Sequence, residues 1–462
     1  MSIEIRNPAA PDQIVATYDE TPDNALDEVV ARARAAQLEW AALPQPERGV
    51  MVTNFVNALE TRSEEIAKSI TKEMGKPLAE ARGEAMKALG EARASVARAN
   101  APIGEVFGSQ IPGTVSYSTR RPRGVILGIN PWNFPFSTPM RKAIPALVYG
   151  NAIILKPASL TPGAVALMAE VAASTLPENL VQAVIGRGAL GQALAEHRGI
   201  DAVSFTGSVE VGKRVATAAA GHLAEVSLEL GGKNPAILND ASDLEKVLDQ
   251  ILLAAFAVCG QRCTAVSRVI VHRDIEEAVV SGLAARAAAM EPMDGMIEGA
   301  KIGPLASAQQ LEDVAGFVSR AVSDGAVIAV GGHRLESPGG GYFYAPTILR
   351  GVTRDMEIAR QEVFGPVLSL IAYDTVDEAL SIANDTAFGL SSCLYSERTD
   401  LVERFVAESE SGMLHVNAGS FPENHLPFVG IKDSSMGVGG SNGPSTIQFY
   451  TTEHAVYRRA CV

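Results

Sequence analysis

Apolar residues recur at helical spacing over the early part of the chain. Ala, Glu, Arg and Leu dominate from Asp23 to Asn100, as in NALDEVVARARAAQLEWAAL and SEEIAKSITKEMGKPLAEARGEAMKAL. Apolar positions that return every three to four residues are typical of amphipathic helices. The pattern predicts three helices at the start of the chain.

The pattern changes after Arg123, where short β-rich runs alternate with helical stretches. The runs read GVILGIN, NAIILKP, LVQAVIG, AVSFTGS and VSLEL. Such alternation predicts βαβ units and a parallel sheet that is covered on both faces. A second alternating region begins near Leu244 and includes SRVIVHR and VLSLIAYD, which predicts a second α/β domain.

The tail after Gly437 has a different character. A glycine-rich break, GVGGSNGPS, precedes the β-rich TIQFYTTEHAVYRR, which is too short to fold alone. Together with the similar TVSYSTRRP that begins at Thr114, it predicts a protruding hairpin that pairs with another subunit.

Composition and charge narrow the function classes. The 462 residues, 47% of them hydrophobic, suit two or three domains, and a net charge of −14 disfavours nucleic acid and anionic membranes as partners. Pro and Gly interrupt the longest apolar runs well short of the roughly 20 residues of a membrane helix. Four cysteines and an N-terminus without a signal pattern predict a cytoplasmic protein with reduced thiols.

Two strand-to-helix junctions carry nucleotide signals. Gly186, Gly188 and Gly191 form G-x-G-x-x-G, but the following strand ends in Thr-Gly-Ser where an acidic residue is expected. A tight turn near a nucleotide is therefore the favoured interpretation, and direct pyrophosphate binding is the alternative. The second junction, SFTGSVEVGKRV, offers small residues and a helix start to a phosphate, or an ordinary Ser N-cap.

The stretch VCGQRCTAVSR places Cys259 and Cys263 four residues apart. The sequence has neither a C-x-x-C pair nor an H-x-x-x-H cluster, so we expect no metal site. A nucleophilic cysteine needs a base and an oxyanion partner nearby. Cys259 ends an apolar helical run and is expected to be a buried thiol, with a reversible disulfide to Cys263 as the alternative.

Five motifs resemble the aldehyde dehydrogenase superfamily, in order over nearly the whole chain: PWNFP, FTGS, LELGGKNP, GQRC and EVFGPV. The 34 residues that separate Glu229 from Cys263 also resemble the family arrangement. The resemblance implies an α/β fold with a Rossmann-type NAD(P)-binding domain at 1–112 and 125–232. A second α/β catalytic domain would span 233–436, and a protruding β-hairpin oligomerisation element would comprise 113–124 and 437–462.

The resemblance also implies a mechanism. Cys263 would attack the aldehyde to give a thiohemiacetal, with the oxyanion held by the Asn133 amide and the Cys263 backbone N–H. Loss of hydride leaves a thioester, which Glu229 would hydrolyse by activating water. The retained Glu229 argues against a CoA-acylating enzyme, and the three residues together argue against a non-catalytic protein.

Cofactor binding is assigned by the same resemblance to nine residues: Pro131, Trp132, Lys156, Ser159, Gly207, Ser208, Gly212, Glu362 and Phe364. Glu362 as a solvated turn residue and Phe364 as a core anchor are the alternatives. NAD-preferring relatives commonly have glutamate at the position of Ser159, so a small hydroxyl permits NADP as well as NAD.

For the substrate, the sequence resembles the succinic and α-ketoglutaric semialdehyde dehydrogenase group. Arg141, eight residues after Asn133, would grip a distal carboxylate, or alternatively pair with an acidic neighbour. Arg262 is a second candidate cation, whereas Glu423 would repel a carboxylate. An uncharged aliphatic or aromatic aldehyde is the alternative substrate, and we expect a homodimer or homotetramer.

Overall fold

The N-terminal region of the computed structural model, which describes residues 2–337, 339–439 and 441–459, begins with a β-hairpin followed by helices. The hairpin strands are β1 (Ser2–Asn7) and β2 (Ala10–Asp19), and the helices are α1 (Leu26–Ala42), α2 (Gln45–Thr61), α3 (Ser63–Met74) and α4 (Leu78–Val96). The prediction of three helices was wrong because the chain breaks three times. Pro44 separates α1 from α2, Arg62 separates α2 from α3, and Gly75, at a left-handed φ of 90°, ends α3 just before Pro77.

A six-stranded sheet follows, in the order β19-β9-β8-β5-β6-β7, parallel except for β19. Its strands are β5 (Val125–Ile129), β6 (Ala152–Lys156), β7 (Val181–Ala183), β8 (Ala202–Thr206), β9 (Glu225–Glu229) and β19 (Ser435–Gly437). The intervening helices are α5 (Ser137–Val148), α6 (Gly163–Thr175), α7 (Gly188–Glu196) and α8 (Val209–Ala220). All residues of β5 and β6 are buried, as expected for central strands covered on both faces.

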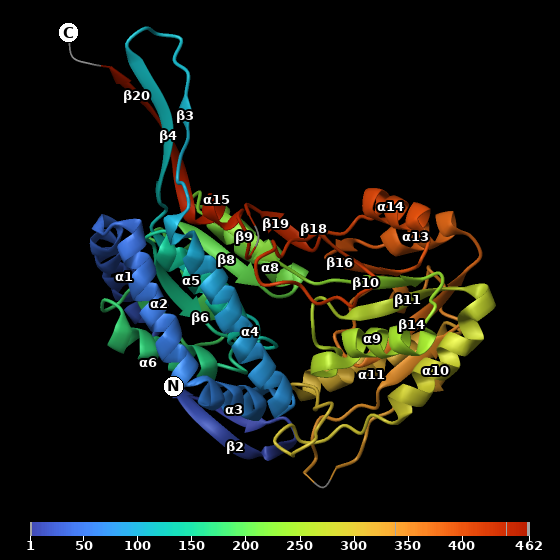
Figure 1. Ribbon diagram of the computed structural model, residues 1–462. Coiled ribbons are helices and arrows are strands. Elements are labelled where there is room, and N and C mark those ends of the chain that lie inside the picture. Colours follow the sequence, from blue (N-terminus) through green and yellow to red (C-terminus); the bar gives the residue numbers. More distant parts are fainter. Residues whose placement is uncertain (1, 338, 440, 460–462) are drawn as a thin grey trace.

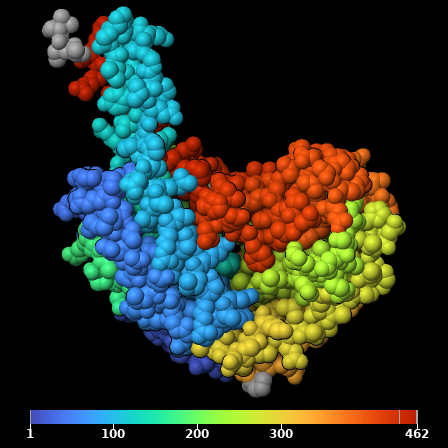
Figure 2. Space-filling model, viewed as in Figure 1, coloured from blue at the N-terminus to red at the C-terminus, as the bar shows by residue number. Residues whose placement is uncertain are grey.

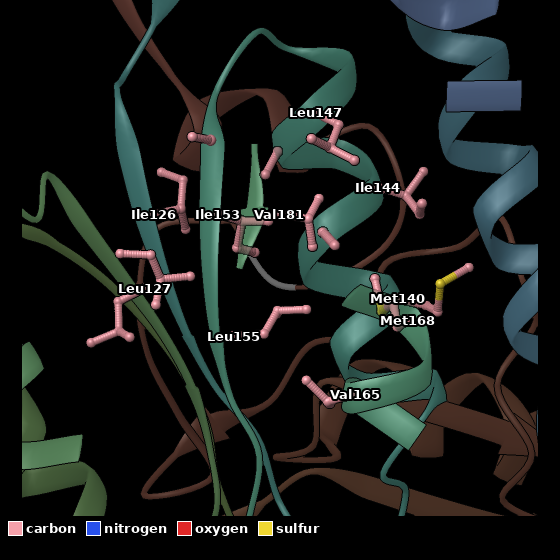
Figure 3. Packing of buried hydrophobic residues seen from close by; sticks show 14 of the residues in the cluster. Ile126, Leu127, Met140, Ile144, Leu147, Ile153, Leu155, Val165, Met168 and Val181 are labelled. Carbon is pink, nitrogen blue, oxygen red and sulfur yellow. The ribbon is translucent and has the colours of Figure 1, made fainter. Parts of the chain in front are cut away.

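The core of this first unit is aliphatic. In Figure 3, Ile153 and Leu155 of β6 lie toward side chains of α5 and α6, including Ile144 and Met168, whereas Leu127 of β5 lies on the other side of the strands. Burial of such side chains contributes roughly 1.5–3 kcal/mol each, which fixes the strand ends that carry polar residues.

A seven-stranded sheet forms a second unit with its own apolar core, in the order β12-β13-β14-β11-β10-β16-β17. Its strands are β10 (Asn234–Leu238), β11 (Val266–His272), β12 (Val327–Val330), β13 (Thr347–Arg350), β14 (Val367–Tyr373), β16 (Ser391–Tyr395) and β17 (Met413–Val416). Its helices are α9 (Leu244–Phe256), α10 (Glu276–Ala288), α11 (Ala308–Ser323), α12 (Glu357–Arg360), α13 (Val376–Asn384) and α14 (Thr399–Glu408). The α/β fold with two parallel-sheet units is thus confirmed.

The β-rich segments at 114–122 and 451–459 pair in a separate sheet. It contains β3 (Val106–Phe107), β4 (Thr114–Pro122) and β20 (Thr451–Arg459), and β20 runs antiparallel to β4 from Thr451 opposite Pro122. Figures 1 and 2 show this sheet projecting as an arm from the body. The remaining short elements are β15 (Phe388–Gly389), β18 (Ile431–Lys432) and α15 (Thr446–Tyr450).

The short apolar runs of the sequence predict no transmembrane helix. Within the described ranges, the helices are too short or too polar to cross a membrane.

Candidate active site

A cavity of about 750 Å³ is lined by residues of both sheet units and of α4. It brings together most of the residues singled out in the sequence: Pro131, Trp132, Asn133, Arg141, Lys156, Ser159, Gly207, Ser208, Glu229, Arg262, Cys263, Glu362 and Phe364. Gly212 is absent from the lining. It is buried in α8, where an added Cβ would lie 2.6 Å from Leu230 Cδ2, so its small size serves packing beneath the cavity.

Asn133 lies in the loop between β5 and α5 and is almost fully buried. Its Nδ2 donates a hydrogen bond of 2.8 Å to the backbone carbonyl of Gln261, two residues before Cys263. A side-chain amide has two N–H groups, so this bond fixes the plane of the amide and leaves the second N–H for a ligand.

A buried ion pair stands behind this loop. Lys76 Nζ lies 2.7 Å from Glu84 Oε2 and donates a second bond of 2.7 Å to the Asn133 carbonyl, with both charged side chains at most 1% exposed. Glu84 Oε1 accepts the backbone N–H groups of Phe136 and Ser137, each at 3.0 Å. Glu84 therefore satisfies the free N–H groups at the start of α5, which has no side-chain cap of its own.

Cys263 follows a turn in which three consecutive residues are left-handed. Val258, Cys259 and Gly260 have φ values of 58°, 56° and 67°. Such a conformation is costly for a β-branched residue, so it persists only when its surroundings impose it. Glu80 of α4 supplies one constraint, because both its carboxylate oxygens accept the Val258 N–H, at 3.0 and 3.1 Å.

The Cys263 thiol is protonated at neutral pH. Burial raises its pKa to about 12, and the nearby charges of Glu362 and Glu229 act in the same direction. Arg141 and Arg262 oppose this effect. A thiolate therefore forms only where a base accepts the proton. Cys259 is buried and free, as expected for a packing thiol.

Glu229 is the last residue of β9, and its carboxyl group is buried. Burial raises its pKa to about 8, although the positive charge of Lys142, a hydrogen bond from the Ser441 backbone and the positive charge of Arg141 act against this. A buried carboxyl group tuned close to neutral pH and facing a cavity is a candidate general base.

Lys142 is buried and interacts electrostatically with this carboxyl group. Its Nζ donates to Thr206 Oγ1 at 2.6 Å, and burial lowers its pKa to about 7.

The residues assigned to the cofactor occupy the strand ends of the first sheet. Lys156 ends β6, and burial lowers its pKa to about 8. Ser208 is the N-cap of α8, its Oγ accepting the Val211 N–H at 3.5 Å, so the capping interpretation holds while the residue also lines the cavity. A Cβ added to Gly186 would lie 2.3 Å from Leu190 Cδ2, so glycine is needed here, as expected for a tight turn.

The EVFGP segment approaches from the second unit. Glu362 Oε1 accepts the Gly232 N–H at 2.9 Å, and burial raises the pKa of this carboxyl group to about 7. A side chain on Gly231 would lie 2.3 Å from Glu362 Oε2, so these glycines make room for the acid. Glu362 is thus held by backbone rather than free in solvent.

Phe364 has a left-handed φ of 55°, and its ring meets that of Trp132 edge-on at 5.4 Å. Both rings line the cavity. A polar strand-end region with Lys156, Glu362 and the α8 N-terminus fits a dinucleotide, whose phosphates suit helix N-termini.

Arg141 pairs with an acidic neighbour, which was the alternative to a contact with the substrate carboxylate. Its Nε and Nη2 each bind one oxygen of Glu91 at 2.7 Å, so one edge of the guanidinium is taken up by this ion pair. Arg262 lies over the Phe421 ring at 4.3 Å, and its Nη2 donates to Ala254 and Ser420 acceptors at 3.3 Å.

Sequence reasoning missed the contribution of α4. Glu80, Gly83, Glu84 and Lys87 all line the cavity. These residues recur at helical spacing over two turns, which is a signal that the sequence contains. Such a polar stripe usually marks a face exposed to solvent, so it does not by itself predict a cavity.

The comparisons with known proteins decide the family. The model described as "Aldehyde dehydrogenase family" matches residues 1–456. The chain belongs to the aldehyde dehydrogenase family. It is 37% identical over 460 residues to an α-ketoglutaric semialdehyde dehydrogenase of Bacillus subtilis, covering 98% of this chain and 94% of that one. It is 35% identical to a betaine aldehyde dehydrogenase of Cereibacter sphaeroides, covering 98% and 93%.

Solved structures agree. Lactaldehyde dehydrogenase from Escherichia coli superimposes with a TM-score of 0.96 at 33% identity, over 100% of this chain and 96% of that one. A 3,6-anhydro-L-galactose dehydrogenase in complex with NADP gives 0.95 at 32%, over 99% and 96%. A betaine aldehyde dehydrogenase from Staphylococcus aureus with NAD⁺ gives 0.94 at 29%, over 99% and 91%. This aldehyde dehydrogenase is therefore an NAD(P)-dependent oxidoreductase, which confirms the resemblance.

The Lys76–Glu84 pair generates a stability prediction. Removing one partner of a buried pair leaves an uncompensated charge and typically costs about 3–5 kcal/mol, so Lys76→Met should lower the midpoint of thermal unfolding strongly. The double variant Lys76→Met/Glu84→Gln buries no charge and should recover much of the loss. Arg93→Met, which breaks a half-exposed pair with Glu60, is the control and should change little. Equal midpoints for the single and double variants would contradict the prediction.

Proposed function

We propose that this dehydrogenase oxidises a small aldehyde with a distal carboxylate, a semialdehyde of the succinic or α-ketoglutaric type, to the acid. The observation that carries the proposal is the convergence of Asn133, Glu229 and Cys263 on one cavity with the candidate cofactor residues. The semialdehyde dehydrogenase name of the Bacillus subtilis relative supports the substrate class. Betaine and lactaldehyde dehydrogenases are also similar, so these aldehydes belong in the test.

The chemistry follows from the positions of the three residues. The Cys263 thiol gives its proton to ionised Glu229 as Sγ bonds the carbonyl carbon, and the oxyanion accepts N–H groups from Asn133 and from the Cys263 backbone. The residues assigned to the cofactor would hold NAD(P), whose chemistry here would be to accept the hydride from this carbon and so leave Cys263 as a thioester. Once Glu229 has released the thiol proton to solvent, its carboxylate takes a proton from water as that water attacks the thioester carbon. The C–S bond then breaks, the acid is released, and Sγ takes the proton from Glu229 to restore the thiol.

For the cofactor, we infer that NADP is accepted as well as NAD. Ser159 lines the cavity close in sequence to Lys156, and it places no carboxylate there to repel a 2′-phosphate. Lys156 supplies a cation that a 2′-phosphate could bind.

The deciding experiment measures nicotinamide reduction with succinic, α-ketoglutaric, betaine, lactic and benzoic-type aldehydes, each with NAD and NADP, with and without CoA. We expect the highest kcat/KM for a semialdehyde, no requirement for CoA, and turnover with NADP. Cys263→Ser should abolish reduction with every aldehyde. A higher kcat/KM for benzaldehyde would overturn the substrate class, whereas an active Cys263→Ser protein would overturn the nucleophile.

Glu229→Gln gives a second prediction. If Glu229 activates the hydrolytic water, the variant should slow thioester hydrolysis by roughly 10²–10⁴-fold. The acid works only when ionised, and its pKa is about 8, so hydrolysis in the wild type should accelerate as pH rises from 7 to 9. Stopped-flow hydrolysis of a pre-formed acyl-enzyme would measure both. A variant that keeps the wild-type rate and pH profile would exclude Glu229 as the base.

We also propose that the arm formed by β3, β4 and β20 joins subunits into a homodimer or homotetramer. Two of its large hydrophobic residues are highly exposed, Val106 at 81% and Tyr457 at 77% of their surface. Charged groups there would oppose association, so Val106→Asp/Tyr457→Asp should lower the mass measured by sedimentation. An unchanged mass would place the subunit interface elsewhere.

The cytoplasmic location stays a prediction from cysteine usage.

A further inference from the structure

Four cations line the cavity, and they differ in how far they are already bound: Lys87, Arg141, Lys156 and Arg262. Lys156 lies at the strand ends assigned to the cofactor. Arg141 is held at two points by Glu91. Arg262 donates three bonds through one nitrogen to backbone and hydroxyl oxygens, and its buried Nε has no partner among the described residues.

Among the three cations that lie away from the cofactor strand ends, Lys87 makes the fewest hydrogen bonds. Its Nζ donates one hydrogen bond of 2.6 Å, to the Pro422 carbonyl, and it forms no ion pair with any described carboxylate. An ammonium group has three donors, so two remain for a ligand. Burial lowers the pKa of Lys87. The negative charge of Glu91 acts against this effect, and the like charges of Arg141 and Arg262 add to it. An anion placed among these three cations would relieve their repulsion.

The place of Lys87 suits a distal group of the substrate. It lies on α4, while the Pro422 loop also carries Phe421, over which Arg262 stacks. Lys87 and Arg262 thus flank the part of the cavity where α4 meets this loop. Three acidic neighbours on α4 are engaged: Glu84 binds Lys76, Glu91 binds Arg141, and Glu80 accepts the Val258 N–H. Glu423, which follows Pro422, does not line this cavity, and its side chain is 68% exposed.

We propose that Lys87, together with Arg262, receives the distal carboxylate of the semialdehyde, and that Lys87 rather than Arg141 determines the preference for an anionic substrate. The inference rests on the proposed function and assigns the carboxylate contact within it. Lys87 is a specificity residue and takes no part in the chemical steps at Cys263.

The test compares succinic semialdehyde with butanal, which has the same four-carbon chain and no carboxylate. Lys87→Gln removes the charge but keeps a donor for the Pro422 carbonyl. A charge-assisted hydrogen bond typically accounts for roughly 10- to 100-fold in affinity. We therefore expect the KM for succinic semialdehyde to rise by that factor, with little change in its kcat and unchanged constants for butanal.

Lys87→Arg, which keeps the charge, should restore most of the affinity, and the exposed Lys68→Gln on α3 is the matched control without effect. Equal losses with both aldehydes would overturn the proposal and leave Lys87 as a structural tie to the loop. Unchanged constants with both would also overturn it. If Lys87→Gln does not fold, Lys87→Arg and Lys87→Met are compared by the ratio of the KM for succinic semialdehyde to the KM for butanal. A higher ratio in Lys87→Met than in Lys87→Arg supports the proposal, and equal ratios overturn it. A wild type that prefers butanal would instead refute the semialdehyde assignment while leaving the dehydrogenase chemistry intact.

Discussion

The hydrogen bond from Asn133 Nδ2 to the Gln261 carbonyl is the contact on which the site depends. It joins the loop after a strand of the first sheet to the turn that precedes Cys263 in the second unit. A neutral hydrogen bond contributes only about 1 kcal/mol to stability, so its value lies in registration rather than in strength. The buried Lys76–Glu84 pair fixes the same loop from behind, because Lys76 binds the Asn133 carbonyl.

Backbone strain is concentrated on both sides of the nucleophile. The left-handed turn at Val258, Cys259 and Gly260 packs against the segment that carries Phe364, itself left-handed. An added Cβ on Gly260 would lie 2.1 Å from the Gly365 carbonyl, so the two segments touch through backbone. Strained conformations of this kind persist only where neighbours impose them, and they commonly mark functional sites. The position of the thiol and that of the Phe364 ring are therefore set by one contact.

How much could be predicted from the sequence depended on how local each signal was. The β-rich runs and the short motifs at strand ends identified Asn133, Glu229, Cys263, Lys156 and Glu362, because parallel strands bring their carboxyl ends to one edge. The pairing of Arg141 with Glu91 could not be decided, since its partner lies 50 residues earlier on another helix. The helix count failed for a local reason, since Arg62 carries no turn signature that a pattern of apolar residues would reveal.

Helix α4 explains why residues outside the family motifs matter to the site. Glu80, Glu84, Lys87 and Glu91 are spaced so that they share one helix face. From that face Glu80 holds the turn before Cys263, Glu84 holds the start of α5, Lys87 holds the Pro422 loop, and Glu91 holds Arg141. Glu84 and Glu91 form ion pairs and Glu80 accepts a backbone N–H, whereas Lys87 has no ion pair with a described carboxylate. A chain of net charge −14 thereby presents a local positive group to its cavity, which total charge alone would not predict.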